Sequence, residues 1–188
     1  PEEAAKARDR RTAFGGAPVI LWSLAGSSIH KVWPWLQESA AWLLDHTDVK
    51  IVYVGDESCQ LLEMAICQGV LKHRLNIDHE ESAKMKLSEM LIRLKEHWGG
   101  VNRIICRSGS WAIRETLSFV ECVDLIVGPE TGVLNAAGLL PVPKVVFLSH
   151  SSHENLTRDW VNATVLEPVN TPCYPCHRLP YTRDFCPE

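Results

Sequence analysis

Residues 123–137 of this chain read VDLIVGPETGVLNAA. The apolar run at 123–127 predicts a buried strand, and the small residues that follow predict a helix over 131–140. A strand that ends at Gly-Pro and is followed at once by a helix leaves backbone N–H groups at the helix start without partners. These donors, with about half a positive charge from the helix dipole, favour a bound anion, and Gly132 places no side chain in its way. The stretch therefore predicts a site for a phosphorylated ligand.

Apolar runs alternate with helical patterns along the rest of the chain. The runs that predict strands lie at 19–22, 49–54, 101–106, 124–127 and 144–148. The helical patterns lie at 32–44, after residue 54, at 79–98, around Ile113 and at 131–140. Continuous Val- and Ile-rich strands separated by helices are typical of a parallel sheet that is covered on both faces. We expect an α/β fold with a doubly wound parallel sheet.

Several helical positions carry more specific expectations. Pro34 lies near the first turn of the helix at 32–44, and Ser110 is placed to cap the helix that begins near Ile113. The residues expected to share apolar helix faces are Leu36, Ala40, Leu43 and Leu44; Leu61, Leu62, Ala65 and Ile66; Leu87, Leu91, Leu94 and Trp98; and Ile113, Leu117 and Val120.

Length and composition indicate how the chain is divided and which classes of protein it does not fit. At 188 residues and 46% hydrophobic, the chain is long enough for one domain with a sizeable core. We divide it into a charged, Ala-rich linker or exposed helix (1–17), a ligand-binding domain (18–168) and a Cys- and Pro-rich tail (169–188). The net charge of -4 argues against a general nucleic-acid binder. No run of about 18 apolar residues predicts a membrane span, no signal peptide is visible, and the missing initial Met suggests a piece of a longer protein.

Five loops follow the predicted strands, and each is rich in Gly, Ser or charge. Ligands of such folds bind outside the carboxyl ends of the strands, so these loops predict a binding rim. They are 25–31, 55–58, 107–111, 129–132 and 149–153. His150 and His153 in the last loop fit two interpretations equally, as rim contacts or as polar residues at a helix start.

The seven cysteines form two groups. Four of them, Cys59, Cys67, Cys106 and Cys122, lie in apolar or helical surroundings and are expected to be free thiols in a reducing compartment. The tail holds Cys173, Cys176, His177 and Cys186, which are enough ligands for a structural zinc that pins the tail. A disulfide, three plain thiols and the haem-attachment pattern Cys-x-x-Cys-His are the alternatives.

Two of the loops resemble glycosyltransferase family 9, the heptosyltransferases of lipopolysaccharide assembly. The segment 26–34, GSSIHKVWP, resembles the family's Gly-x-Ser…Lys-x-Trp-Pro pattern, and 128–132, GPETG, resembles its Gly-(Pro/Asn)-Asp-Thr-Gly segment. The resemblance covers about residues 18–188. It implies the Rossmann-like, C-terminal half of a two-domain GT-B glycosyltransferase, which binds a nucleotide-diphosphate sugar such as ADP-heptose.

The resemblance also implies roles for individual residues. Lys31 would contact the donor phosphates beside Ser27 and Ser28, and Thr131 and Gly132 would receive the diphosphate on backbone amides. Asp56 or Glu57 would hold the ribose, and the base would lie near 108–111, where Ser110 and Trp111 stand. No divalent metal is implied, because Lys31 and the helix dipole offset the charge of the leaving diphosphate.

This sequence departs from the family pattern at two positions. The motif's Asp is Glu130 here, which we expect to face sugar hydroxyls, and its His is Asn135, which can donate a hydrogen bond to a phosphate or a hydroxyl. The general base and the saccharide acceptor, such as the lipopolysaccharide core, would belong to a domain outside this sequence. The chain alone is then expected to bind donor and transfer nothing.

Plainer interpretations stand beside these. Lys31 is alternatively a solvated surface lysine, Glu130 a favourable acid in a first helical turn, and Trp33 and Trp35 packing residues. The main hypothesis is a cytoplasmic glycosyltransferase donor domain with at most peripheral membrane contact. The alternative is a non-catalytic binding module, either for nucleotide sugars or stapled by a metal.

Overall fold

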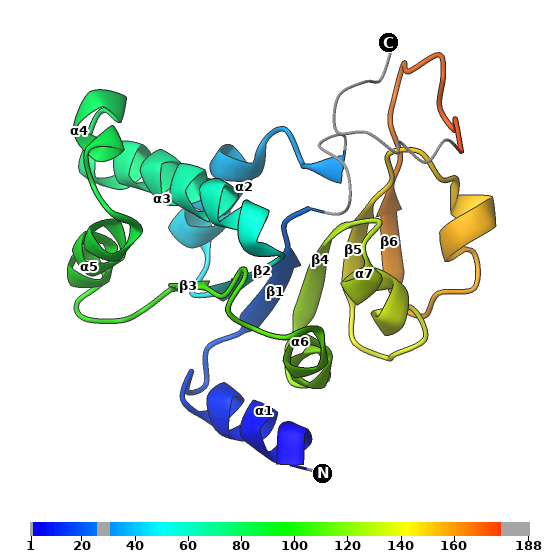
Figure 1. Ribbon diagram of the computed structural model, residues 1–188, viewed down its shortest axis with the longest axis horizontal. Helices are drawn as coiled ribbons and strands as arrows, with labels where there is room; N and C mark the ends of the chain where they lie inside the picture. Colours follow the sequence, from blue (N-terminus) through cyan, green and yellow to red (C-terminus); the bar gives the residue numbers. More distant parts are fainter. Residues whose placement is uncertain (1, 26–30, 178–188) are drawn as a thin grey trace.

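The computed structural model describes residues 2–25 and 31–177, and within them six parallel strands form a single sheet (Figure 1). The strand order is β3-β2-β1-β4-β5-β6. The strands are β1 (Val19–Ser23), β2 (Lys50–Val54), β3 (Ile104–Cys106), β4 (Leu125–Pro129), β5 (Lys144–Phe147) and β6 (Ala163–Leu166). The predicted doubly wound parallel sheet is confirmed.

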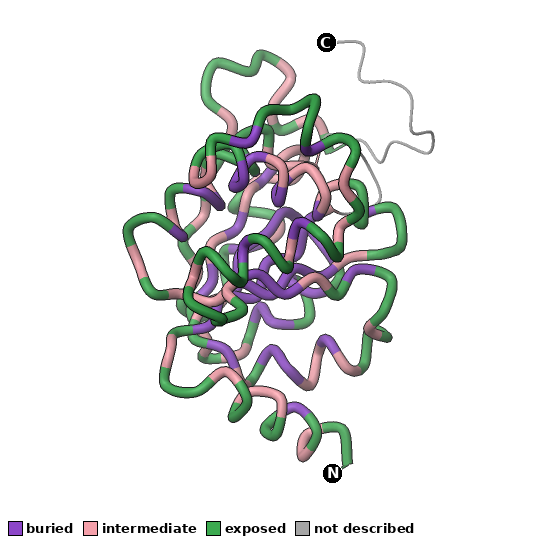
Figure 2. Tube along the Cα trace, turned by 90° about the vertical axis from the view of Figure 1, so that its left-hand side faces the viewer, coloured by how far each residue is buried: buried purple, intermediate pink, exposed green. Residues whose placement is uncertain are grey.

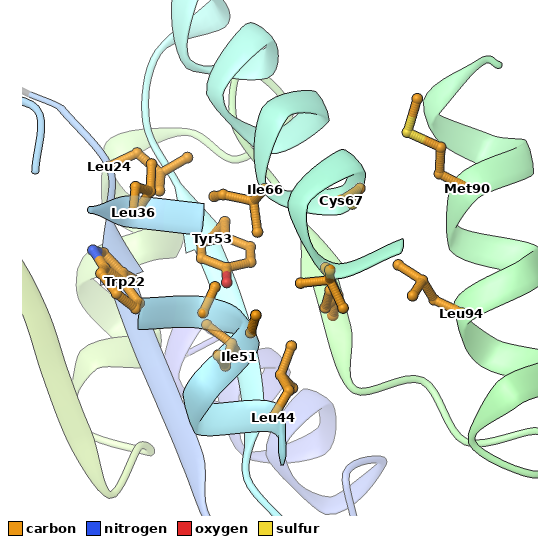
Figure 3. Close-up of a cluster of buried hydrophobic side chains, with 14 of the residues drawn as sticks. Trp22, Leu24, Leu36, Leu44, Ile51, Tyr53, Ile66, Cys67, Met90 and Leu94 are labelled. Carbon is orange, nitrogen blue, oxygen red and sulfur yellow. The ribbon is translucent and has the colours of Figure 1, made fainter. Parts of the chain in front are cut away.

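Helices cover both faces of the sheet. They are α1 (Glu2–Thr12), α2 (Leu36–His46), α3 (Gln60–Leu75), α4 (His79–Ala83), α5 (Leu87–His97), α6 (Ile113–Val120) and α7 (Gly132–Ala137), with short helical turns η2 (Glu57–Cys59) and η3 (His153–Thr157). One core lies beneath α2, α3 and α5 and includes Trp22, Tyr53, Ile66 and Leu94 (Figure 3). A second core lies beneath α1, α6 and α7. The buried positions run through the centre of the molecule, and the outer turns of the helices are exposed (Figure 2).

The charged N-terminal segment forms α1, which packs on α6 without a wide apolar stripe. Ala7 is buried, and two ion pairs flank it, from Arg10 to Glu115 at 2.8 Å and from Arg11 to Asp124 at 3.1 Å. Small and charged side chains thus attach this helix to the domain.

Two predicted helices differ from their expected bounds. The helix expected over 32–44 begins at Leu36, two residues after Pro34. The pattern at 79–98 forms two helices because it holds two separate start signals. Asp78 caps α4 by accepting a hydrogen bond from the Glu81 N–H, and Glu89 reaches back to the N–H of Lys86 to start α5.

Other local predictions were wrong. Ser110 does not cap α6, which begins at Ile113, and its hydroxyl donates to the carbonyl of Arg107 instead. Leu61 is 73% exposed and Ile113 is 57% exposed, so neither belongs to its expected apolar face. The predicted strand at 101–106 is shorter, and β6 was not predicted.

Within residues 2–25 and 31–177, no helix is long and apolar enough to cross a bilayer.

Candidate functional site

The candidate site lies at the carboxyl edge of the sheet, where the chain leaves β1 and β4. These neighbouring strands are where the strand order reverses, because β2 and β3 extend the sheet on one side and β5 and β6 on the other. Loops that leave such a pair diverge and open a crevice, the usual ligand position in this class of fold. The predicted residues Ser27 and Ser28 lie outside the described residues, whereas Lys31 is described.

Lys31 bridges the two strands at this point. Its ammonium nitrogen donates to the backbone carbonyl of Glu130, with Nζ and O 3.0 Å apart. Burial lowers the pKa of Lys31, and the charge of Glu130 partly offsets that effect. The half-buried ammonium therefore lies at the crevice between β1 and β4, where the sequence predicts a phosphate contact.

The side chain of Glu130 is buried and hydrogen-bonded to the loop after β5. Its side chain is 4% exposed, and one carboxylate oxygen accepts hydrogen bonds from the N–H groups of Ser149, His150 and Ser151. Burial raises the pKa of Glu130, but these donors outweigh it and hold the pKa below its ordinary value. The carboxylate therefore anchors the loop after β5, and its contact to sugar hydroxyls stays a prediction.

Thr131 and Gly132 form the start of α7. The Thr131 hydroxyl accepts from the N–H of Leu134 and lies 3.1 Å from the Ser23 hydroxyl, so this side chain caps the helix. Gly132 is exposed, and a Cβ built on it meets nothing within 4 Å. The N–H groups of Gly132 and Val133 have no acceptor among the described residues. Asn135 is exposed one turn further along α7.

A second part of the site follows β2 and β3. Asp56 and Glu57 are both exposed after β2, and a hydrogen bond from Ser58 lowers the pKa of Asp56. The loop after β3 closes against them, because the N–H of Gly109 donates to the carbonyl of Gly55 at 3.0 Å. The structure thus brings the two predicted carboxylates beside the loop that carries Ser110.

Ser110 is exposed in that loop, whereas Trp111 is half-buried. Its ring packs edge-on against Phe119 at 5.2 Å, with the guanidinium of Arg10 at 4.7 Å on the ring. Trp111 therefore belongs to the contact between α1 and α6, and Ser110 is the more accessible of the two predicted base contacts.

Sequence reasoning missed Glu63, a buried acid in α3. Its carboxylate accepts hydrogen bonds from the N–H groups of Arg107 and Ser108, at 3.0 and 2.9 Å. An acid inside a helical pattern gives no signal of such a role, because its partners lie more than forty residues away.

The two histidines of the loop after β5 have different positions and partners. His150 belongs to the rim: its Nε2 lies 3.3 Å from Glu130 Oε2, and its Nδ1 lies 3.1 Å from the Ser149 hydroxyl. Burial lowers the pKa of His150, the charges of Lys31 and His177 lower it further, and Glu130 partly offsets them. His153 begins η3, where its Nδ1 lies 2.8 Å from the Thr157 hydroxyl.

The cysteine-rich tail passes close to this rim. The N–H of His177 donates to the carbonyl of His150 at 2.9 Å. Cys173, Cys176 and His177 are described, and Cys186 lies outside the described residues. Among the described residues, no three His, Cys, Asp or Glu side chains converge in a way that would hold a metal ion. The zinc site stays a prediction.

An apolar groove of about 540 Å³ lies between α2 and the sheet face formed by β1, β4, β5 and β6. Trp22, Trp42, Phe147 and Leu166 contribute to its walls. Trp33 stacks on Phe147 at 4.6 Å and is a packing residue as predicted, whereas Trp35 is 61% exposed. Among the described residues that line the groove, Glu38 is the one that carries a charge, whereas the rim holds several charged and polar side chains.

Comparison with known proteins supports this architecture. No protein-family model and no curated protein matches the sequence. The fold resembles ADP-heptose lps heptosyltransferase II of E. coli, with 16% sequence identity and a TM-score of 0.62, over 90% of this chain and 44% of that one. It also resembles a glycosyl transferase family 9 structure from Veillonella parvula, with 13% identity and a TM-score of 0.60, over 91% of this chain and 42% of that one. The chain therefore spans less than half the length of these two structures, and it has the α/β fold of heptosyltransferase-like family 9 glycosyltransferases.

Proposed function

We propose that this chain is the donor-binding half of a glycosyltransferase and binds a nucleotide-diphosphate sugar at the carboxyl edge of its sheet. The observation that carries the proposal is the meeting of Lys31 with the start of α7 between β1 and β4. A half-buried ammonium and two backbone N–H groups without acceptors among the described residues are donors that suit a diphosphate. The heptosyltransferase-like fold supports the same interpretation.

We infer the orientation of the ligand from the strand order. In sheets of this order an acid after the second strand takes the ribose, so the nucleoside would lie beside Asp56 and Glu57. The sugar then lies towards the loop after β5, where His150 and Ser149 stand. Lys31 supplies charge to the leaving diphosphate, so glycosyl transfer here would need no divalent metal.

The remaining parts of the proposal concern the whole protein. A second domain would supply the acceptor site and the general base, and the acceptor would be a saccharide such as lipopolysaccharide core. Reaction in the cytoplasm, with at most peripheral membrane contact, follows from that acceptor. The 188-residue chain alone would bind donor without transferring the sugar.

Calorimetric titration with ADP, GDP, UDP and CDP tests donor binding. One diphosphate should bind, and Lys31→Ala should weaken it by about 1–3 kcal/mol, which is roughly 5- to 150-fold. Lys72→Ala is the matched control, since Lys72 is an exposed lysine on α3 far along the chain from the rim. The proposal fails if the folded chain binds none of the four, or if both variants bind like the wild type.

A non-catalytic binding module is the second candidate. It is favoured by Glu130, whose carboxylate is occupied by the loop after β5, and by Asn135 at the position of the motif histidine. A longer form of the protein that includes the second domain separates the two: hydrolysis or transfer from a nucleotide sugar supports the enzyme, and binding without turnover supports the module. Zinc analysis of protein purified without chelator tests the metal-stapled version, which a metal-free, folded protein excludes.

A further inference from the structure

Glu63 stands out among the buried polar residues because it touches the candidate site only through backbone. It lies in α3, its residue is 2% exposed, and one carboxylate oxygen accepts from two consecutive N–H groups of the loop after β3. The N–H of Arg107 is shared with the carbonyl of Tyr53, whereas that of Ser108 has Glu63 as its acceptor. The position of Ser108 therefore depends most on this carboxylate.

A buried carboxylate is costly unless its partners compensate for the lost water. Among the described residues, no Lys, Arg or His forms an ion pair with Glu63. Its described hydrogen-bond donors are the two loop amides and the thiol of Cys106, the last residue of β3. An apolar side chain would fill the same core position at lower cost. What the carboxylate provides is the fixed position of the loop.

That loop forms one wall of the nucleoside side of the site. Gln60, one turn earlier in α3, donates to the carbonyl of Ser108, and the N–H of Gly109 donates to the carbonyl of Gly55. Contact is so close that a Cβ on Gly109 would lie 3.0 Å from the Cα of Glu57. Displacing the loop would therefore displace the wall beside Asp56 and Glu57.

We propose that Glu63 is a positioning residue for the nucleoside part of the donor, acting through the backbone of residues 107–109 and leaving the diphosphate contacts unaffected. The inference rests on the proposed donor site, which places the nucleoside beside β2 and β3. Glu130 provides the natural comparison, because it also binds loop amides with a buried carboxylate but lies across the β1–β4 crevice. The two glutamates should then affect different parts of the ligand.

The test compares two probes, the nucleoside diphosphate that binds best among ADP, GDP, UDP and CDP, and inorganic pyrophosphate. Glu63→Leu should weaken the nucleoside diphosphate at least tenfold more than it weakens pyrophosphate. Glu63→Gln keeps an oxygen acceptor and should hold the ratio of the two affinities within threefold of wild type. Glu130→Leu, the matched buried variant, should also leave that ratio within threefold. Glu63→Asp withdraws the carboxylate by one methylene group. It should also weaken the nucleoside diphosphate more than pyrophosphate, by a smaller factor than Glu63→Leu, and it serves as the test if Glu63→Leu does not fold.

Hydrogen exchange gives a readout without ligand. The amides of Arg107 and Ser108 should exchange faster in Glu63→Leu and Glu63→Asp, with Ser149 and His150 unchanged. Three results would overturn the role of Glu63 while leaving the donor site intact. Glu63→Leu could weaken both probes equally, Glu63→Leu and Glu63→Asp could both leave the ratio of the two affinities unchanged, or Glu130→Leu could change that ratio as much as Glu63→Leu does. A wild-type chain that binds no nucleoside diphosphate would instead overturn the proposed function, and the role of Glu63 with it.

Discussion

The ammonium of Lys31 lies 3.0 Å from the backbone carbonyl oxygen of Glu130, so a side chain from the loop after β1 reaches the end of β4. The same residue, Glu130, holds the loop after β5 through its carboxylate. Three neighbouring strands are thus joined at their carboxyl ends through one residue, by its carbonyl on one side and its side chain on the other. Changes at Glu130 should therefore affect stability as well as binding.

We expect Glu130→Gln to lower the free energy of unfolding by about 1–3 kcal/mol at pH 7, since a buried, multiply hydrogen-bonded carboxylate is lost. The folded state lowers the pKa of Glu130 from 4.5, so this stabilisation is present above that pH and is lost as the pH falls through the folded pKa. Urea unfolding at pH 7, 5 and 3 should show the difference between wild type and variant shrinking at pH 3. Glu38→Gln, at an exposed glutamate, is the control; a constant difference at all three pH values would contradict the assignment.

His150 gives a second pH window. The folded state lowers its pKa from 6.5, so the unfolded chain binds this proton more tightly. Wild-type stability should therefore fall as the pH drops below about 6.5, and His150→Gln should remove part of that fall. Thermal unfolding between pH 7.5 and 5 measures it, with His73→Gln at an exposed position on α3 as control. Parallel curves for wild type and His150→Gln would show that His150 does not contribute.

The fold could be predicted from sequence to the extent that local pattern determines it. The strands at 19–22 and 49–54 are continuous apolar runs, and β1 and β2 contain them. The strand β6 was missed because Ala163–Leu166 alternates weakly and its residues are half-buried or exposed. Periodicity alone predicts one continuous helix over 79–98, because it does not register the second start at Lys86.

The position of the site at one edge of the sheet could be predicted from the sequence, but the hydrogen bonds within the site could not. Topology alone places the loops after successive parallel strands together, so the rim follows from the strand assignment. The orientation of Glu130 depends on the loop after β5, and the role of Glu63 depends on the loop after β3. Such long-range contacts leave no periodic trace in the sequence.

Gly132 offers a test in which stability and binding should change in opposite directions. A Cβ at this first position of α7 meets nothing within 4 Å, so Gly132→Ala should raise stability by about 0.5–1 kcal/mol through helix propensity. The added methyl group would stand beside the N–H groups of Gly132 and Val133 and should weaken the bound diphosphate by about tenfold, or ~1.4 kcal/mol. Thermal unfolding and calorimetry on the same preparation measure both effects. If the variant is more stable but binds the diphosphate with unchanged affinity, the diphosphate does not bind at the start of α7.

Gly109 tests the close contact on the nucleoside side. Its φ of +69° and the 3.0 Å approach to the Cα of Glu57 both oppose a side chain, whereas Gly99 has a φ of +62° with open space around it. Gly99→Ala should therefore cost about 1–2 kcal/mol from backbone strain alone, and Gly109→Ala should cost about 1–3 kcal/mol more because the backbone at Glu57 must move. Urea unfolding measures the loss of stability in each variant, and the difference between the two losses gives the cost of the close contact between Gly109 and Glu57. In calorimetry, Gly109→Ala should weaken the nucleoside diphosphate and leave pyrophosphate unchanged, and Gly99→Ala should alter neither. Equal costs for the two variants would mean that the loops after β2 and β3 do not support one another.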